Sequence, residues 1–345
     1  FDVGHYVRVA RIAERGKLDA IFLADTPAIT DRIDYRSFMS MEPTIVLATV
    51  AAATTHIGLI ATASTTYNEP YNIARRFATL DLASGGRAGW NAVTTADAAA
   101  SRNFGLANVL EHKARYDRAK EFAEVVHALW DSWEDDAFVG DKATARFVDT
   151  SKVHPIAHRG AHYSVAGPLN VPRSPQGRPV TVQAGGSSDG RDLAAAQAEA
   201  VFTLAQTIDE GAAYARDLRT RAAAYGRSGD SIVILPGLAT VIGSTEAEAK
   251  RRQDELWELV PIEYSLARLA GTLQVDPAIL ELDKPLPDLP LPANANHTMF
   301  QGTVALARRG NLTVRQLLRA LGGGVGHRII VGTPEQIADD IEAWF

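Results

Sequence analysis

Residues 183 to 190 read Gln-Ala-Gly-Gly-Ser-Ser-Asp-Gly, and they stand between an apolar run and an alanine-rich, helix-like stretch. When a strand enters a helix through such a loop, free backbone N–H groups at the helix start favour an anion such as phosphate. The loop is not a P-loop, because Arg191 and Asp192 follow Gly190 where a lysine and a hydroxyl would stand. A tight turn with a serine N-cap would use the same residues, so the loop by itself leaves both interpretations open.

Two groups of side chains that include histidine could also do chemistry. His112 and Tyr116 are four residues apart in a helical pattern, so their side chains share one helix face. They could contact one ligand, or form a solvated pair at a helix start. The histidines at 154, 158 and 162 have the same spacing, but Pro155 and Gly160 interrupt any helix there, which disfavours a metal site.

Polar side chains also follow four of the predicted strands. In a parallel sheet with helical crossovers the carboxyl ends of the strands meet at one edge, and active sites of barrel enzymes lie there. These residues could form a rim that holds a polar ligand. They are Asp25, Thr62 to Thr66, Asn91 with Thr94 and Thr95, and Gln183 with the loop after it.

The elements that must position these residues alternate between short apolar strands and helices. Such alternation is typical of a parallel sheet covered by helices, either doubly wound or a (β/α)8 barrel. A barrel has eight strands, so on that interpretation the first and last strands are missing from the chain. Long insertions fall at about 96–178 and 261–328. We predict six strands, at 19–25, 56–65, 87–95, 179–185, 199–205 and 231–243.

Composition restricts the partners. The chain has 345 residues, a formal net charge of −6 and no basic block, so nothing points to nucleic acid or to an anionic membrane. No stretch of 18 apolar residues is present, which predicts no transmembrane helix. The absence of cysteine excludes disulfides and thiol nucleophiles and fits a cytoplasmic protein.

Three segments give a specific resemblance: SGGRAGWNAVTT (84–95), HKARYDRAKEF (112–122) and SPQGRPVTVQAG (174–185). With the rest of the chain, they resemble the flavin-dependent monooxygenases of the bacterial-luciferase-like superfamily. The resemblance is closest to the branch that acts on nitrilotriacetate, EDTA, dibenzothiophene sulfone and long-chain alkanes. It implies an α/β fold, a (β/α)8 TIM barrel with insertions, forming one domain over residues 1–345.

The resemblance also implies site residues. FMN would bind non-covalently, with Asp25 near the flavin and Thr62 near its ring. His112 and Tyr116 would hold the phosphate or ribityl end, and Ser187 the phosphate. We expect the helix after the loop to start at Asp189 and that carboxylate to point away from the anion and cap the helix. No metal is implied, and no residue is assigned as catalytic.

The implied activity is that of the oxygenase component of a two-component monooxygenase. A separate NAD(P)H:flavin reductase would supply FMNH2, and O2 would form a C4a-peroxyflavin that oxidises a small organic substrate, with xenobiotics among the candidates. A homo-oligomer, dimer or tetramer, is expected. Two alternatives remain: a deazaflavin-dependent oxidoreductase on the same barrel, and a flavin-binding protein without turnover.

Overall fold

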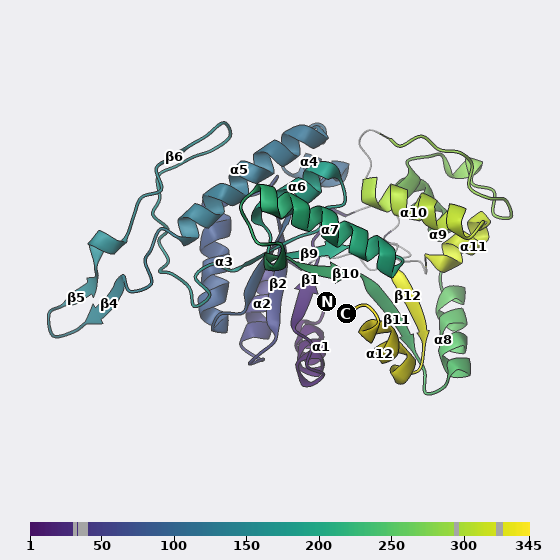
Figure 1. The fold of residues 1–345 in the computed structure, drawn as a ribbon, viewed down its shortest axis with the longest axis horizontal. Coiled ribbons are helices and arrows are strands. Elements are labelled where there is room, and N and C mark those ends of the chain that lie inside the picture. The colour runs from purple at the N-terminus through teal and green to yellow at the C-terminus, as the bar shows by residue number, and fades with distance from the viewer. Residues whose placement is uncertain (30–32, 34–40, 293–296, 322–326) are drawn as a thin grey trace.

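The computed structural model describes residues 1–29, 33, 41–292, 297–321 and 327–345 (Figure 1). Its centre is a parallel sheet with the strand order β1-β2-β3-β8-β9-β10, as the strand–helix alternation predicted. The six strands are β1 (Ala20–Leu23), β2 (Gly58–Ser64), β3 (Ala88–Val93), β8 (Val180–Gln183), β9 (Ala200–Thr203) and β10 (Val233–Pro236).

The sheet curls into a half-barrel rather than lying open. Phe22 on β1 and Phe202 on β9 come together edge to face, with ring centroids 6.1 Å apart, although three strands separate β1 from β9. Their side chains therefore lie on the concave side of the sheet. This curvature favours the barrel over the doubly wound alternative.

Helices cover the convex side because alternate strand residues are apolar there. Trp90 on β3 is fully buried, and its ring lies 5.9 Å from that of Phe122 and 6.1 Å from those of Phe77 and Trp130. Side chains of a strand alternate between its faces, so the intervening residues of β2 and β3 face the concave side. The helices on the sheet are α1 (Val3–Arg15), α2 (Pro43–Ala51), α3 (Pro70–Ser84), α5 (His112–Trp130), α6 (Ser188–Gln197) and α7 (Ile208–Ala224).

The predicted strand 231–243 is wrong as one element. The chain leaves the main sheet after Pro236, and Gly237 separates β10 from a second strand, β11 (Leu238–Ile242). β11 pairs in parallel with β12 (Arg328–Gly332), a strand that the sequence interpretation missed. β12 directly precedes the final helix α12 (Pro334–Glu342), whose start has a capping box formed by Thr333 and Gln336.

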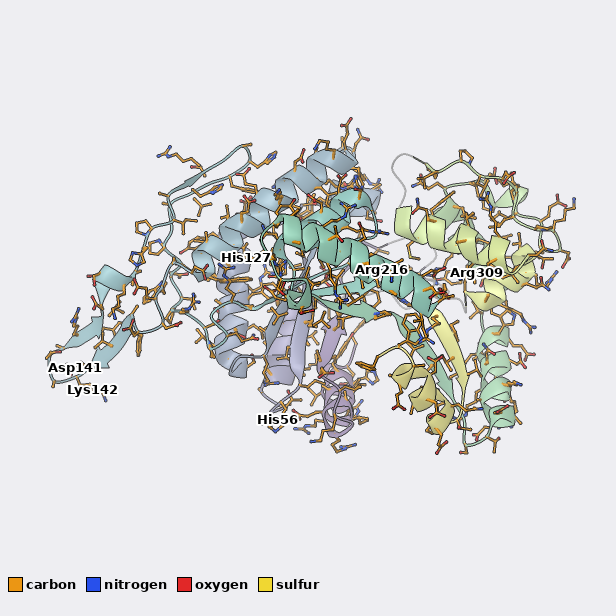
Figure 2. All side chains as sticks on the ribbon, in the orientation of Figure 1. His56, His127, Asp141, Lys142, Arg216 and Arg309 are labelled. Carbon is orange, nitrogen blue, oxygen red and sulfur yellow. The ribbon has the colours of Figure 1, made fainter. Side chains whose placement is uncertain are left out.

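The two predicted insertions contain their own small elements. The first holds α4 (Ala98–Asn103) and the hairpins β4–β5 (Phe138–Asp141, Arg146–Val148) and β6–β7 (His158–Arg159, Ser164–Val165). The β4–β5 hairpin projects from the body, with Asp141 and Lys142 at its tip (Figure 2). After α8 (Glu246–Glu258), the second insertion packs α9 (Ile262–Leu273), α10 (His297–Arg309) and α11 (Val314–Ala320) around a separate apolar cluster. Three 3-10 turns lie at Thr150–Lys152, Gly229–Ser231 and Pro277–Ile279.

None of the helices in the described part of the chain combines the length and apolar character needed to cross a bilayer.

Candidate functional site

The glycine-serine loop joins the carboxyl end of β8 to the first turn of α6. Ser187 is the N-cap, and its Oγ accepts a hydrogen bond from the Gly190 N–H at 3.1 Å. The helix begins at Ser188, one residue before the predicted start. The loop packs closely against the helix. A Cβ added to Gly185 would lie only 2.6 Å from the Gly190 carbonyl carbon, so a side chain would not fit there. Free N–H groups of the first turn therefore stand beside the Ser187 hydroxyl, which still has a proton to donate.

Two residues of α5 meet this loop. The His112 and Tyr116 rings lie 4.7 Å apart, and a Cβ added to Gly190 would be 3.1 Å from the Tyr116 Oη. His112 Nδ1 is 3.0 Å from an oxygen of Asp189. The structure thus brings together three of the five predicted cofactor residues. The prediction for Asp189 is wrong: its carboxylate pairs with His112 on the neighbouring helix, because Ser187 already caps α6.

Side chains of α7 contact the loop and support it, a contact that the sequence did not predict. Tyr214 donates its hydroxyl to the Gly185 carbonyl at 2.5 Å. Arg191 lies over the Tyr214 ring at 4.8 Å, donates to the Gly186 carbonyl at 3.1 Å and pairs with Asp217 at 2.9 Å. Burial raises the pKa of Tyr214 to about 12, so the phenol stays a hydrogen-bond donor at neutral pH. The only signal in the sequence was that Tyr214 and Asp217 are three residues apart in a helical segment, which places both side chains on one face.

A buried polar pair lies on the concave side of the sheet. Thr62 on β2 and Asn91 on β3 are 3% and 4% exposed, and Asn91 donates its amide N–H to the Thr62 hydroxyl at 2.9 Å. The amide oxygen of Asn91 has no hydrogen-bond partner among the described residues. Buried polar atoms are almost always satisfied in folded proteins, so this oxygen is suited to accept an N–H from a bound ligand.

Asp25 lies two residues beyond β1, at the edge of the main sheet, and is half-buried. Burial is the main cause that raises its pKa, and the nearby carboxylate of Glu42 raises it further. The backbone N–H of Thr26 and the charge of Arg76 oppose that shift. The groups that act on the Asp25 carboxylate do not include the other four predicted residues, so its place near the cofactor stays a prediction.

Of the three spaced histidines, His154 and His158 pair with different carboxylates, and the backbone N–H of His162 donates to Glu121 at 2.9 Å. His154 Nε2 lies 2.7 Å from Glu134, and His158 Nε2 lies 3.0 Å from Glu121. Within the described ranges no group of three or more His, Cys, Asp or Glu side chains could hold a metal ion.

The donor set fits an elongated ligand with a phosphate at one end and a polar ring at the other. The N–H groups of α6, the Ser187 hydroxyl and the Tyr116 hydroxyl surround one anion position. The unsatisfied amide oxygen of Asn91 offers an acceptor on the concave side. FMN has both features, and the residues present fit it.

Comparison with known proteins agrees with this geometry. The family model described as luciferase-like monooxygenase matches residues 1–345. Nitrilotriacetate monooxygenase component A of Aminobacter aminovorans is 47% identical over 357 residues, covering 99% of this chain and 79% of that protein. The structure of EDTA monooxygenase from Chelativorans sp. BNC1 matches with a TM-score of 0.79 and 39% identity over 100% of this chain and 80% of the other. A riboflavin lyase structure with modified FMN and riboflavin matches with a TM-score of 0.86 and 35% identity, covering 99% and 77%.

Proposed function

Because this chain belongs to the luciferase-like monooxygenase family, we propose that it is the FMN-dependent oxygenase component of a two-component monooxygenase. The observation that carries the proposal is the convergence of Ser187, His112 and Tyr116 on the first turn of α6. This is a phosphate-binding arrangement at the carboxyl end of a barrel strand, where cofactors of such folds bind.

The residues of this chain would bind and orient the cofactor. The N–H groups of α6, Ser187, His112 and Tyr116 would hold the phosphate end, and Thr62 with Asn91 would face the ring. When bound in its reduced form, FMN activates O2 so that one oxygen atom passes to an organic substrate. The apolar concave wall, which includes Phe22 and Phe202, would keep water from that reaction. Asp25 completes the proposed set near the flavin.

The proposed substrate is a small organic molecule. Relatives named for nitrilotriacetate and EDTA, both aminopolycarboxylates, support a search that begins with that class. The reduced flavin would come from a separate NAD(P)H:flavin reductase. We further propose a single barrel domain over residues 1–345, a homo-oligomer and a cytoplasmic location.

The proposal is tested by supplying the reduced flavin separately. Purified protein with FMN and NADH should not oxidise NADH until an independent NADH:FMN reductase is added. Rapid NADH oxidation without the reductase would contradict the two-component reaction. With the reductase present, candidate substrates should be oxidised only when the protein is included.

The cofactor itself is tested by spectroscopy. The protein should quench FMN fluorescence on binding and should not bind a 5-deazaflavin more tightly than FMN. The opposite preference would favour the deazaflavin-dependent alternative. Tight FMN binding without any oxygen transfer, over a broad substrate panel, would favour the non-catalytic alternative.

A further inference from the structure

Arg115 on α5 is a buried cation without an anionic partner. It is only 5% exposed, and its Nη1 donates to the Leu110 carbonyl at 2.7 Å. Its Nε is buried and has no hydrogen-bond partner in the described structure. No carboxylate of the described residues forms an ion pair with it. The guanidinium has therefore lost most of its hydration and has gained one neutral acceptor in return.

A buried guanidinium without an anionic partner destabilises the folded protein unless a bound anion pairs with it. Burying an unpaired charge costs several kcal/mol even after local relaxation. Burial lowers the pKa of Arg115, and only the phenol groups of Tyr116 and Tyr67 act in the opposite direction. A ligand anion beside the guanidinium would recover part of the lost solvation through a charge-assisted hydrogen bond.

The helix face that carries Arg115 also carries residues of the proposed phosphate site. Arg115 lies on α5 three residues after His112, and residues three apart on a helix share one face. His112 and Tyr116 on that face both meet the first turn of α6. The phenol of Tyr116 is also one of the two groups that act electrostatically on Arg115. The unpaired guanidinium thus belongs to the surroundings of the phosphate-binding loop.

The other cations around this loop already have protein partners, although Arg191 and Arg221 share a single carboxylate. Arg191 and Arg221 both pair with Asp217, at 2.9 and 3.1 Å. His112 pairs with Asp189, and Arg118 donates to the Tyr163 hydroxyl at 2.6 Å. A bound phosphate monoester carries between one and two negative charges at neutral pH. Helix N–H groups offset only part of that charge.

We propose that Arg115 is the cationic partner of the flavin phosphate and makes this chain select FMN over riboflavin by charge. The inference rests on the proposed function and adds a residue to its cofactor site. It separates two tasks: Ser187 and the start of α6 position the phosphate, and Arg115 neutralises it.

The test compares Arg115→Gln and Arg115→Lys with Lys113→Gln. Lys113 lies on the same helix, is 79% exposed and pairs with Asp117, so this control changes the net charge equally. Dissociation constants of oxidised FMN and riboflavin are measured by quenching of flavin fluorescence. Arg115→Gln should weaken FMN binding by about tenfold or more and change riboflavin binding less than about twofold. Arg115→Lys should recover part of the FMN affinity, and Lys113→Gln should change neither.

Thermal unfolding without ligand shows whether Arg115 is structural. Removing an unpaired buried charge should leave the Tm of the ligand-free protein unchanged or raise it. The rise in Tm that saturating FMN produces should become smaller in Arg115→Gln. A large loss of ligand-free Tm, or equal weakening of FMN and riboflavin, would overturn the proposal. Unchanged FMN affinity would overturn it as well.

Binding of inorganic phosphate distinguishes a failure of this proposal from a failure of the proposed function. If the wild-type protein bound neither flavin, the proposed function would fail. Stabilisation of the wild type by inorganic phosphate, lost in Arg115→Gln and kept in Lys113→Gln, would still support an anion site at Arg115. Equal stabilisation of all three proteins by phosphate would refute that site.

Discussion

Protonation of His127 should measurably lower the free energy of unfolding in mild acid. His127 lies on α5 against the sheet, is 8% exposed, and its Nε2 is 2.9 Å from the Thr181 hydroxyl (Figure 2). Burial is the main cause that lowers its pKa, to about 4, and the positive charges of Arg178 and Arg227 lower it further. Asp131 and a hydrogen bond with Gln197 oppose the shift.

The sign of this pH dependence follows from the number of protons bound in the folded and unfolded states. In the unfolded chain the histidine binds a proton at about pH 6.5, whereas the folded protein resists protonation down to about pH 4. Between these values the unfolded state holds more protons, so stability rises with pH and is lost as the pH falls. Integrating over the two pKa values gives a loss of about 2 kcal/mol in the free energy of unfolding between pH 7 and pH 5.

The assay is urea denaturation of the wild type and His127→Gln at both pH values. The glutamine can keep a hydrogen bond to Thr181 but does not titrate. The stability lost between pH 7 and pH 5 should therefore be smaller in the variant by about 2 kcal/mol. Glu199 lies in the same region, and burial raises its pKa. Its contribution to stability therefore changes with pH in the direction opposite to that of His127, and it is the same in both proteins. Equal losses in both proteins would refute the reasoning, and the exposed His56→Gln should behave as the wild type (Figure 2).

Three further predictions concern the cofactor site. Ser187→Ala should weaken FMN binding by roughly tenfold and leave riboflavin binding nearly unchanged; equal weakening in a fluorescence titration would make the loop a structural turn only. Gly190→Ala should reduce both Tm and FMN affinity, because its Cβ would lie 2.9 Å from the Gly185 Cα; an unchanged Tm would contradict that close contact. Thr62→Val should lower the free energy of unfolding by about 1–3 kcal/mol, because it leaves the Asn91 amide N–H unpaired; unchanged urea denaturation would show that another acceptor replaces the hydroxyl.

Local patterns in the sequence located the strands of the main sheet, although β10 was predicted as part of one longer strand. Apolar runs predicted strands at 56–65 and 87–95, and the structure has β2 and β3 there. Thr333, Pro334 and Gln336 are residue types that favour the start of a helix, and α12 begins there. These signals are readable because capping and side-chain alternation act between residues a few positions apart. The loop at 183–190 was likewise predicted as a strand-to-helix turn.

Only the tertiary structure decided which of those turns and polar groups act together. The pairing of His112 with Asp189, the hydroxyl of Tyr214 on the Gly185 carbonyl and the isolation of Arg115 all depend on how α5, α6 and α7 pack. β12 was missed because its partner β11 lies far away along the chain. Contacts of this kind leave no periodic trace in a single sequence, since each side chain is compatible with many partners until the fold selects one.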